Sequence, residues 1–407
     1  MPTRKPQTKS PWRHLVWILP LLVVDFFLSR SLSAGCARSG APDKGGDAPA
    51  VAAPARPGGG AEAPAAPEPP PPPPPVWQDF HTPTPQQDLL HPEAPGVLQP
   101  TGSGRLVSAM FGSTRTGSIN GRLAPRFHEG VDIAATARNN RGAPTDPIYA
   151  VTDGRVAYVN TVAGNSSYGK YIVLEHPDPS LGLVTRANGS VVTSVVYTLY
   201  AHLADIRFGV RAGAAVRAGD EIATMGNTSN DRTGIPMARA HLHWEIGLML
   251  NSRYDRLSRE QKTANPMGLY NGLNLFGVDA LDVWKAHMND PAMTFGGYLA
   301  HLKPAMTLVL RGKNPDFFVR NPGLWHGAPY DGGPITVTLG ESGIPLSGRN
   351  ATPMELKLLG NTRQAVVEAD ESVLGRNARA YIQKSSSFKT GWIVTAKGRA
   401  WMDHLFF

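Results

Sequence analysis

Short β-rich segments separated by Gly and Asn fill the chain between residues 106 and 270. Several of them alternate apolar and polar side chains, which is typical of strands with one buried face, and Gly-containing turns bound them. The clearest are PIYAV (147–151), RVAYV (155–159), YIVLE (171–175), VVYTLY (195–200) and LHWEI (242–246). We therefore expect a mainly β fold, built on an antiparallel sheet.

His128 and Asp132 lie four residues apart in the sequence His-Glu-Gly-Val-Asp. Gly130 and its β-branched neighbour argue against a helix that would bring the two together. In a straight strand they would share a face but lie about 13 Å apart. Binding of one metal by both side chains therefore requires a bend or bulge, and Gly130 sits where a bulge costs least.

His241 and His243 are two residues apart in a predicted strand, so they face the same way about 6.6 Å apart. One of them can bind a metal while the other stands beside it. His202, in Tyr-Ala-His-Leu, ends a third predicted strand. Two imidazoles and one carboxylate suit a catalytic zinc ion whose fourth position is left to water. The two remaining histidines would take a proton from that water or stabilise an oxyanion.

The order HxxxD, then YAHL, then HLH resembles the lysostaphin- or LytM-type zinc metalloendopeptidases, which cleave peptide bonds in bacterial peptidoglycan. The matching stretches are RFHEGVDIAA (126–135), PIYAVTDG (147–154), YTLYAHL (197–203), VRAGDEI (216–222) and AHLHWEI (240–246). The resemblance implies that His128, Asp132 and His243 bind one Zn²⁺ per chain. It also implies that His202 and His241 act on water and on the tetrahedral intermediate.

We therefore expect a zinc-dependent endopeptidase that hydrolyses peptide cross-links of peptidoglycan. Many relatives lose these residues and only activate other wall hydrolases, so a catalytically weak LytM-type regulator is the first alternative. A zinc peptidase that acts on protein is the second. This chain keeps every metal and catalytic position of the pattern, which favours an active enzyme.

The chain departs from the family pattern in two long connections, at 176–196 and 230–239, and we expect both to border the substrate groove. Glu245 shares the face of His243 and either orients it or is exposed at the surface. Glu129 has no assigned role. The remaining histidines of this part of the chain and beyond it are expected to be structural or at the surface: His176, His287, His301, His326 and His404.

The N-terminus has the order of an export signal. Basic residues precede a 14-residue apolar run at 15–28, and small residues follow at 33–35. The run is shorter than the roughly 20 residues that span a bilayer. The sole cysteine, Cys36, follows Leu-Ser-Ala-Gly, which resembles a bacterial lipobox. We expect a lipoprotein-type signal peptide at 1–36 and a lipidated Cys36 that anchors the exported protein in the bacterial cell envelope. An uncleaved anchor is the alternative.

Residues 37–105 are rich in Ala, Pro and Gly and include seven consecutive prolines at 69–75. We expect a disordered tether and lead-in here, because such a composition buries too little apolar surface to offset chain entropy. The formal net charge is +8, but residues 1–35 hold five of the basic side chains against one acidic. The rest of the chain is only weakly basic, which gives no support for a nucleic-acid partner.

The C-terminal third suggests a further region. The segment 279–288 (DALDVWKAHM) is predicted to be a short helix, with Asp279 near its start. Five runs are predicted strands: MTLVLRG, PITVTLG, MELKLLG, QAVVEAD and GWIVTAKG. We therefore divide the remainder into a metallopeptidase domain at 106–272, a connecting helical segment at 273–304 and a β-rich domain of unknown role at 305–407.

Overall fold

The computed structural model of the chain describes residues 79–119, 122–186, 188–230, 234–374 and 381–406. The predicted signal peptide, Cys36 and the proline run lie outside the described residues. None of the helices found in the described ranges combines the length and the apolar character that a membrane crossing requires.

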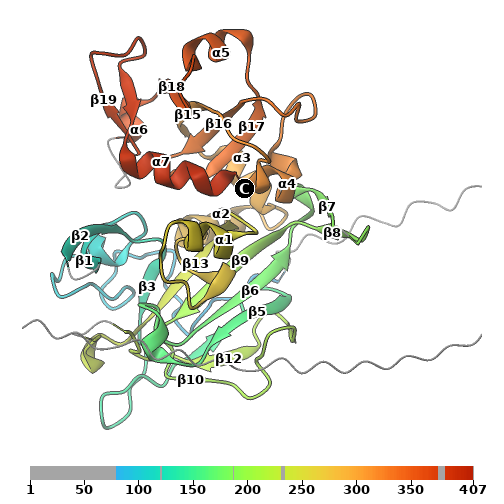
Figure 1. The fold of residues 1–407 in the computed structure, drawn as a ribbon. Coiled ribbons are helices and arrows are strands. Elements are labelled where there is room, and N and C mark those ends of the chain that lie inside the picture. Colours follow the sequence, from blue (N-terminus) through green and yellow to red (C-terminus); the bar gives the residue numbers. More distant parts are fainter. Residues whose placement is uncertain (1–78, 120–121, 187, 231–233, 375–380, 407) are drawn as a thin grey trace, which may run out of the picture. The chain divides into compact units, whose positions relative to one another are not determined.

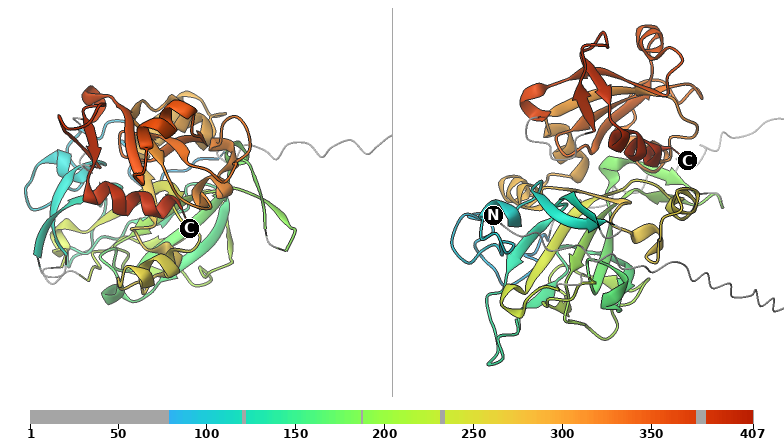
Figure 2. Two further views of the ribbon diagram at one scale, coloured as in Figure 1. Left: turned by 45° about the horizontal axis from the view of Figure 1, so that its top comes forward. Right: turned by 60° about the vertical axis from the view of Figure 1, so that its left-hand side comes forward.

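Seven antiparallel strands form the main sheet (Figure 1, Figure 2). Its central strand is β13 (His241–Met249), which pairs with β9 (Val195–Ala201) along one edge. Along its other edge β13 pairs first with β3 (Val131–Ala134) and then with β14 (Leu275–Val278). Beyond β9 the order continues through β6 (Tyr171–Pro177), β5 (Gly154–Asn160) and β11 (Ala215–Val216). The mainly β expectation is confirmed.

Alternation along β13 places its side chains on two faces of the sheet. Leu242, Trp244 and Ile246 point into the main core and are fully buried. The alternate positions, His241, His243 and Glu245, are on the opposite face, where β6 and β9 supply a second apolar cluster that includes Tyr171, Val173, Tyr197 and Leu199. Because both faces are covered, polar groups on β13 need partners from the protein itself.

Smaller elements surround this sheet. A second sheet has the order β10 (Asp205–Ile206), β12 (Glu221–Thr224), β4 (Pro147–Tyr149). Two hairpins, β1 (Thr114–Ile119) with β2 (Arg122–Phe127) and β7 (Leu183–Thr185) with β8 (Val191–Thr193), complete the strands of this region. Among the described residues of this region, the α-helix is α1 (Tyr254–Glu260). All five strands predicted between 147 and 246 are present within these elements.

The lead-in at 79–105 packs on the main sheet. Leu89, Val97 and Leu98 are almost fully buried in the main core. The backbone of this segment also pairs with β3, since Ala134 N donates to Val97 O (3.0 Å) and Gln99 N donates to Asp132 O (2.9 Å). The segment therefore extends the sheet next to the strand that carries Asp132.

The C-terminal region contains a four-stranded antiparallel sheet in the order β17-β16-β15-β18. Its strands are β15 (Pro304–Leu310), β16 (Ile335–Gly340), β17 (Pro345–Asn350) and β18 (Gln364–Ala369), and a short pair, β19 (Ile382–Lys384) and β20 (Trp392–Val394), follows. The helices are α2 (Ala280–Asn289), α3 (Phe295–His301), α4 (Asp316–Arg320), α5 (Pro353–Leu359), α6 (Glu371–Leu374) and α7 (Ala396–Met402).

The predicted helix and three of the five predicted strands of this region are confirmed, whereas the predicted connecting segment at 273–304 begins with β14, a strand of the main sheet. The predicted helix at 279–288 is α2, and the Asp279 carboxylate accepts from the backbone N–H of Leu281. The predicted strand MELKLLG is wrong, because it is α5. A capping box formed by Thr352 and Glu355, with Pro353 at the first helical position, starts a helix there. Within GWIVTAKG, only β20 is a strand, and α7 begins after Thr395.

The connection at 176–196 contacts the C-terminal region. It enters β9 at the end opposite His202, about 20 Å away along the strand. Its side chains hold the C-terminal region: Ser194 Oγ donates to Arg320 O (2.7 Å), and Asp178 Oδ2 accepts from Phe295 N (2.8 Å). This connection therefore links the main sheet to the C-terminal region, and Ser194 and Val195 lie at the end of β9 opposite His202.

Candidate metal centre

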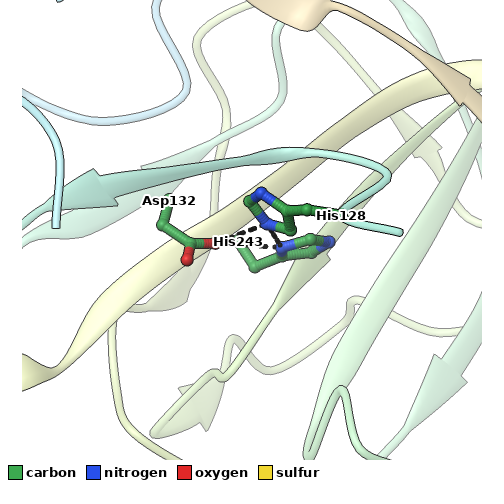
Figure 3. Close-up of side chains that lie close together, drawn as sticks. All are labelled: His128, Asp132 and His243. Carbon is green, nitrogen blue, oxygen red and sulfur yellow. Dashed lines mark hydrogen bonds and ion pairs between the residues drawn. The ribbon is translucent and has the colours of Figure 1, made fainter. Parts of the chain in front are cut away.

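Three side chains converge where β3 pairs with β13 in the main sheet (Figure 3). His128 follows the last residue of β2, Asp132 is the second residue of β3, and His243 is the third residue of β13. Asp132 and His243 are directly opposite each other in the β3–β13 pairing. The predicted bend between His128 and Asp132 is present, because the chain leaves β2 and enters β3 around Gly130.

Gly130 is required at this bend by close packing. A Cβ at this position would lie 2.4 Å from the Trp244 carbonyl oxygen and 3.0 Å from the His243 ring. No real side chain tolerates a backbone contact that short. The glycine therefore lets the loop between β2 and β3 approach β13, which brings His128 to His243.

The three candidate donor atoms form a nearly equilateral triangle. His128 Nε2, His243 Nδ1 and Asp132 Oδ1 are each 3.0 Å from the other two. All three residues are buried, with at most 5% exposure. Within the described residues, this is the group of histidine and acidic side chains whose spacing suits a metal ion.

The outer nitrogen of each ligand histidine has its own partner. His128 Nδ1 lies 2.8 Å from Met110 O, a carbonyl that can only accept. His243 Nε2 lies 2.8 Å from Glu245 Oε1. With these outer nitrogens protonated, the inner nitrogens are free to present lone pairs to a metal. The tautomers that metal binding requires are thus imposed by the protein.

Glu245 is a fully buried carboxylate with three donors. Besides His243, it accepts from Tyr168 OH (2.6 Å) and Tyr197 OH (3.0 Å). Burial, together with the charge of Glu245, raises the pKa of both tyrosines well above 10, so their hydroxyls stay protonated and donate. The surface alternative for Glu245 is therefore wrong, and the residue orients His243.

His202 and His241 lie beside the triangle. Their rings are 4.9 Å apart in a T-shaped contact, and the His202 ring is 5.9 Å from that of His243. His202 has a left-handed backbone (φ 62°), which is uncommon for a residue other than glycine, and it lies just after the end of β9. His241 Nε2 is 3.5 Å from Asp132 Oδ2. The structure thus brings all five predicted residues together.

Hydrogen bonds also assign the proton on each of these two rings. His202 Nδ1 faces Thr228 O (2.8 Å) and His241 Nδ1 faces Arg239 O (2.7 Å), so each Nδ1 carries the hydrogen. Burial lowers the pKa of His202 well below 6.5 and lowers that of His241. At neutral pH both rings are therefore neutral, with an Nε2 lone pair available to accept a proton.

The charges at the triangle suit a cation. Burial by itself would raise the pKa of Asp132, but the neighbouring histidines hold it well below 3.8, so the carboxylate is ionised. Burial lowers the pKa of His128. Against the effect of burial, Asp132 and Glu245 raise the pKa of His243 to about 9. Without a metal, His243 is therefore protonated and donates to both carboxylates.

The donor set fits zinc. Ligands about 2.0–2.2 Å from a tetrahedral ion lie roughly 3.3–3.6 Å from one another, close to the 3.0 Å separations here. Two imidazoles and one carboxylate are also a ligand set found at catalytic zinc sites. The histidines expected to be structural or superficial, His176, His287, His301, His326 and His404, are not in this group.

The second long connection, at 230–239, does reach the site. Arg239 O is the partner of His241 Nδ1, and the Arg138 guanidinium donates to the carbonyls of Met237 (2.8 Å), Ala238 (3.3 Å) and Ala240 (3.2 Å). Arg138 thus fixes the backbone immediately before His241. Sequence reasoning did not identify Arg138, Tyr168 or Tyr197, since no spacing rule links them to the histidines.

The five residues of this site lie in a stretch that matches a known protein family. The sequence profile of the family described as Peptidase family M23 matches residues 126–255. A search of curated protein sequences gives no match.

Similar solved structures include a zinc-containing peptidase from Vibrio cholerae, with 27% identity, coverage of 37% of this chain and 36% of that chain, and a TM-score of 0.23. The catalytic domain of lysostaphin from Staphylococcus simulans is 24% identical. The match covers 34% of this chain and 76% of that domain, with a TM-score of 0.21. Csd3 from Helicobacter pylori is 19% identical. The match covers 45% of this chain and 38% of the Csd3 chain, with a TM-score of 0.21. The match spans about a third of the Vibrio cholerae chain. Residues 126–255 of this chain are a peptidase M23 domain.

Proposed function

We propose that this chain is a zinc-dependent endopeptidase that hydrolyses peptide cross-links of bacterial peptidoglycan. The observation that carries the proposal is the triangle of His128, Asp132 and His243 with two neutral imidazoles beside it. A bound zinc ion would supply a Lewis acid that lowers the pKa of water towards about 7 and polarises the scissile carbonyl.

Side chains of the protein itself then accept and donate the protons of the reaction. Nε2 of His202 or His241 accepts the proton of the attacking water. Each ring is neutral, and its Nδ1–H donates to a backbone carbonyl, so Nε2 has a free lone pair. The resulting imidazolium can stabilise the adjacent negative charge and return the proton to the leaving amine. Glu245 keeps His243 in the tautomer that binds metal.

The family and the N-terminal sequence support the proposed substrate class and location. Lysostaphin, one of the similar structures, is described as an antimicrobial peptidase. We infer that this chain acts outside the cytoplasm, on the cell wall, with the signal-like residues 1–36 directing export and a lipidated Cys36 anchoring it to a membrane. Mass spectrometry of the N-terminal peptide of the membrane-extracted protein tests the anchor: a diacylated Cys36 supports it, and an intact Met1 contradicts it.

The activity is tested with the full chain and purified peptidoglycan sacculi. Fragments released with and without a chelator are identified by mass spectrometry. We expect chelator-sensitive release of new amino and carboxyl ends, and loss of this release in His241→Ala and His243→Ala. The exposed His301 provides a matched control, and His301→Ala should retain activity. Parallel incubation with a Gly-rich protein distinguishes a wall enzyme from a general protein peptidase.

A regulator of another wall hydrolase is the second candidate, and the burial of the site favours it. His128, Asp132, His241 and His243 are each at most 7% exposed, which leaves little access for a substrate. A protein that binds one zinc per chain yet releases no fragment would support this alternative. Release of fragments at a rate that depends on His241 would contradict it.

A further inference from the structure

Arg115 reaches the candidate metal centre from outside the region that matches the M23 family. It is on β1, eleven residues before the matched range of 126–255 begins. Its Nη2 donates to Asp132 Oδ2 at 2.5 Å, and its side chain is 25% exposed whereas that of Asp132 is 2% exposed. No sequence pattern pointed to this residue.

The two oxygens of Asp132 have separate partners. Oδ1 faces the inner nitrogens of His128 and His243, where a metal would bind. Oδ2 faces Arg115 and, at 3.5 Å, His241 Nε2. A carboxylate that binds a metal through one oxygen needs its second oxygen held, because otherwise rotation about its last bond misdirects the first.

Arg115 is itself held by the segment just before it. Its Nε donates to Ser108 O (2.8 Å), and its Nη2 also contacts that carbonyl. The same segment supplies Met110 O, which orients His128. Its backbone is tied to His128 in both directions, by Gly112 N to His128 O and His128 N to Ser113 O, each 2.9 Å. Residues 108–115, which we call the support segment, thus contact two of the three ligands.

We propose that Arg115 is a positioning residue that holds the Asp132 carboxylate in its metal-binding orientation, and that the support segment is therefore part of the metal centre. This inference rests on the proposed function only in requiring that the triangle binds a metal. The guanidinium suits the role because its planar fork contacts a carboxylate and a carbonyl at once, which the point charge of a lysine does not.

Metal binding by the full chain tests the proposal without any assay of activity. Zinc affinity is measured by competition with a chromogenic chelator, and the visible absorption of the Co²⁺-substituted protein reports the coordination geometry. We expect Arg115→Met to weaken zinc binding by about 10- to 100-fold and to change the Co²⁺ spectrum. Arg115→Lys keeps the charge and one contact, so it should recover part of the affinity.

Arg126 provides the matched control, because it is opposite Arg115 in the β1–β2 hairpin but is exposed. Arg126→Met removes the same charge from the same hairpin and should leave affinity and spectrum unchanged. Wild-type affinity and spectrum in Arg115→Met would overturn the proposal, even if activity were lost, since Arg115 would then act on the substrate. An equal loss in Arg126→Met would also overturn it. A wild-type chain that binds no zinc would instead refute the metal centre itself.

Discussion

Single residues determine how the buried polar groups on β13 are accommodated. Glu245 is the clearest case, because a carboxylate without contact to water is costly unless several donors satisfy it. Here His243, Tyr168 and Tyr197 all donate to it. Despite its burial, these contacts lower its pKa, so the carboxylate is ionised next to His243. The negative charge of Glu245 and its contact with His243 Nε2 both favour a metal at the other ring nitrogen, His243 Nδ1.

Replacing Glu245 with Gln is expected to weaken zinc binding by about 10- to 100-fold, because the charge that orients His243 is lost while the side-chain size is kept. Competition with a chelator measures the affinity. Glu175→Gln is the control: Glu175 is also on the main sheet, but its partners are Arg155 and Tyr270. Equal affinities for Glu245→Gln and the wild-type protein would contradict the assigned role.

His176 makes stability depend on pH. It is fully buried between Asp153 O and Thr198 Oγ1, and burial lowers its pKa from 6.5 to about 4. The unfolded chain therefore binds more protons than the folded one between these values, so this contribution is complete above the unfolded pKa and is lost as pH falls towards 4. We expect a loss on the order of 2 kcal/mol in the free energy of unfolding between neutral pH and about pH 5.

The measurement is denaturant unfolding at several pH values, for the wild-type protein and for His176→Gln. The variant should show a shallower decline of stability in acid. His301→Gln, at an exposed position, should keep the wild-type slope. Identical slopes for the wild-type protein and His176→Gln would show that His176 does not titrate as described.

At the scale of elements, the lead-in differs from its expected character. Its composition predicts disorder, yet residues 79–99 bury apolar side chains and extend the sheet beside β3. Few apolar residues suffice here, because each of them enters a core that the main sheet has already formed. A different, local effect decided α5, where the capping box of Thr352 and Glu355 outweighed an apolar pattern that is typical of a strand.

Neighbouring leucines in the lead-in allow a direct test. Leu89 is 1% exposed and Leu90 is 44% exposed. Leu89→Ala should lower the free energy of unfolding by about 2–5 kcal/mol, because it leaves a cavity in the main core. Leu90→Ala should change it by less than about 0.5 kcal/mol. Denaturant unfolding gives both values, and equal small effects would mean that the lead-in does not pack on the sheet.

At the scale of the whole molecule, the described residues from 79 onward share one continuous core that includes side chains of both the main sheet and the C-terminal sheet. Polar contacts reinforce this junction. The Asp316 carboxylate accepts from Ser252 N (2.7 Å) and Ser252 Oγ (2.6 Å), and pairs with Arg320 (3.1 Å). Asn251 Nδ2 donates to His404 O near the C-terminus (2.8 Å). The C-terminal region is thus expected to unfold together with the M23 domain.

Asp316→Ala removes the centre of that junction. It should lower the free energy of unfolding by about 3 kcal/mol, because it leaves Arg320 and the Ser252 N–H without their partner. Differential scanning calorimetry should show one transition for the wild-type chain and a lower midpoint for the variant. Asp331→Ala, at an exposed site, should have little effect. Two separate wild-type transitions would contradict the shared core.

The sequence by itself determined the chemistry of the site and the strands that carry it. Alternation in LHWEI and VVYTLY defined which side chains share a face, and the order HxxxD, YAHL, HLH, through its resemblance to a zinc metalloendopeptidase family, implied which side chains bind zinc. These features are local, because a strand's period and a residue's ligand chemistry need only its neighbours along the chain.

Only the tertiary structure decided which atoms meet. The pairing of β3 with β13 brings Asp132 within 3.0 Å of a residue 111 positions away. Packing of distant segments places Tyr168 on Glu245 and Arg115 on Asp132. Such contacts depend on strand register and on the shape of the core, which are set by the whole chain at once and leave no periodic signal near the residues concerned.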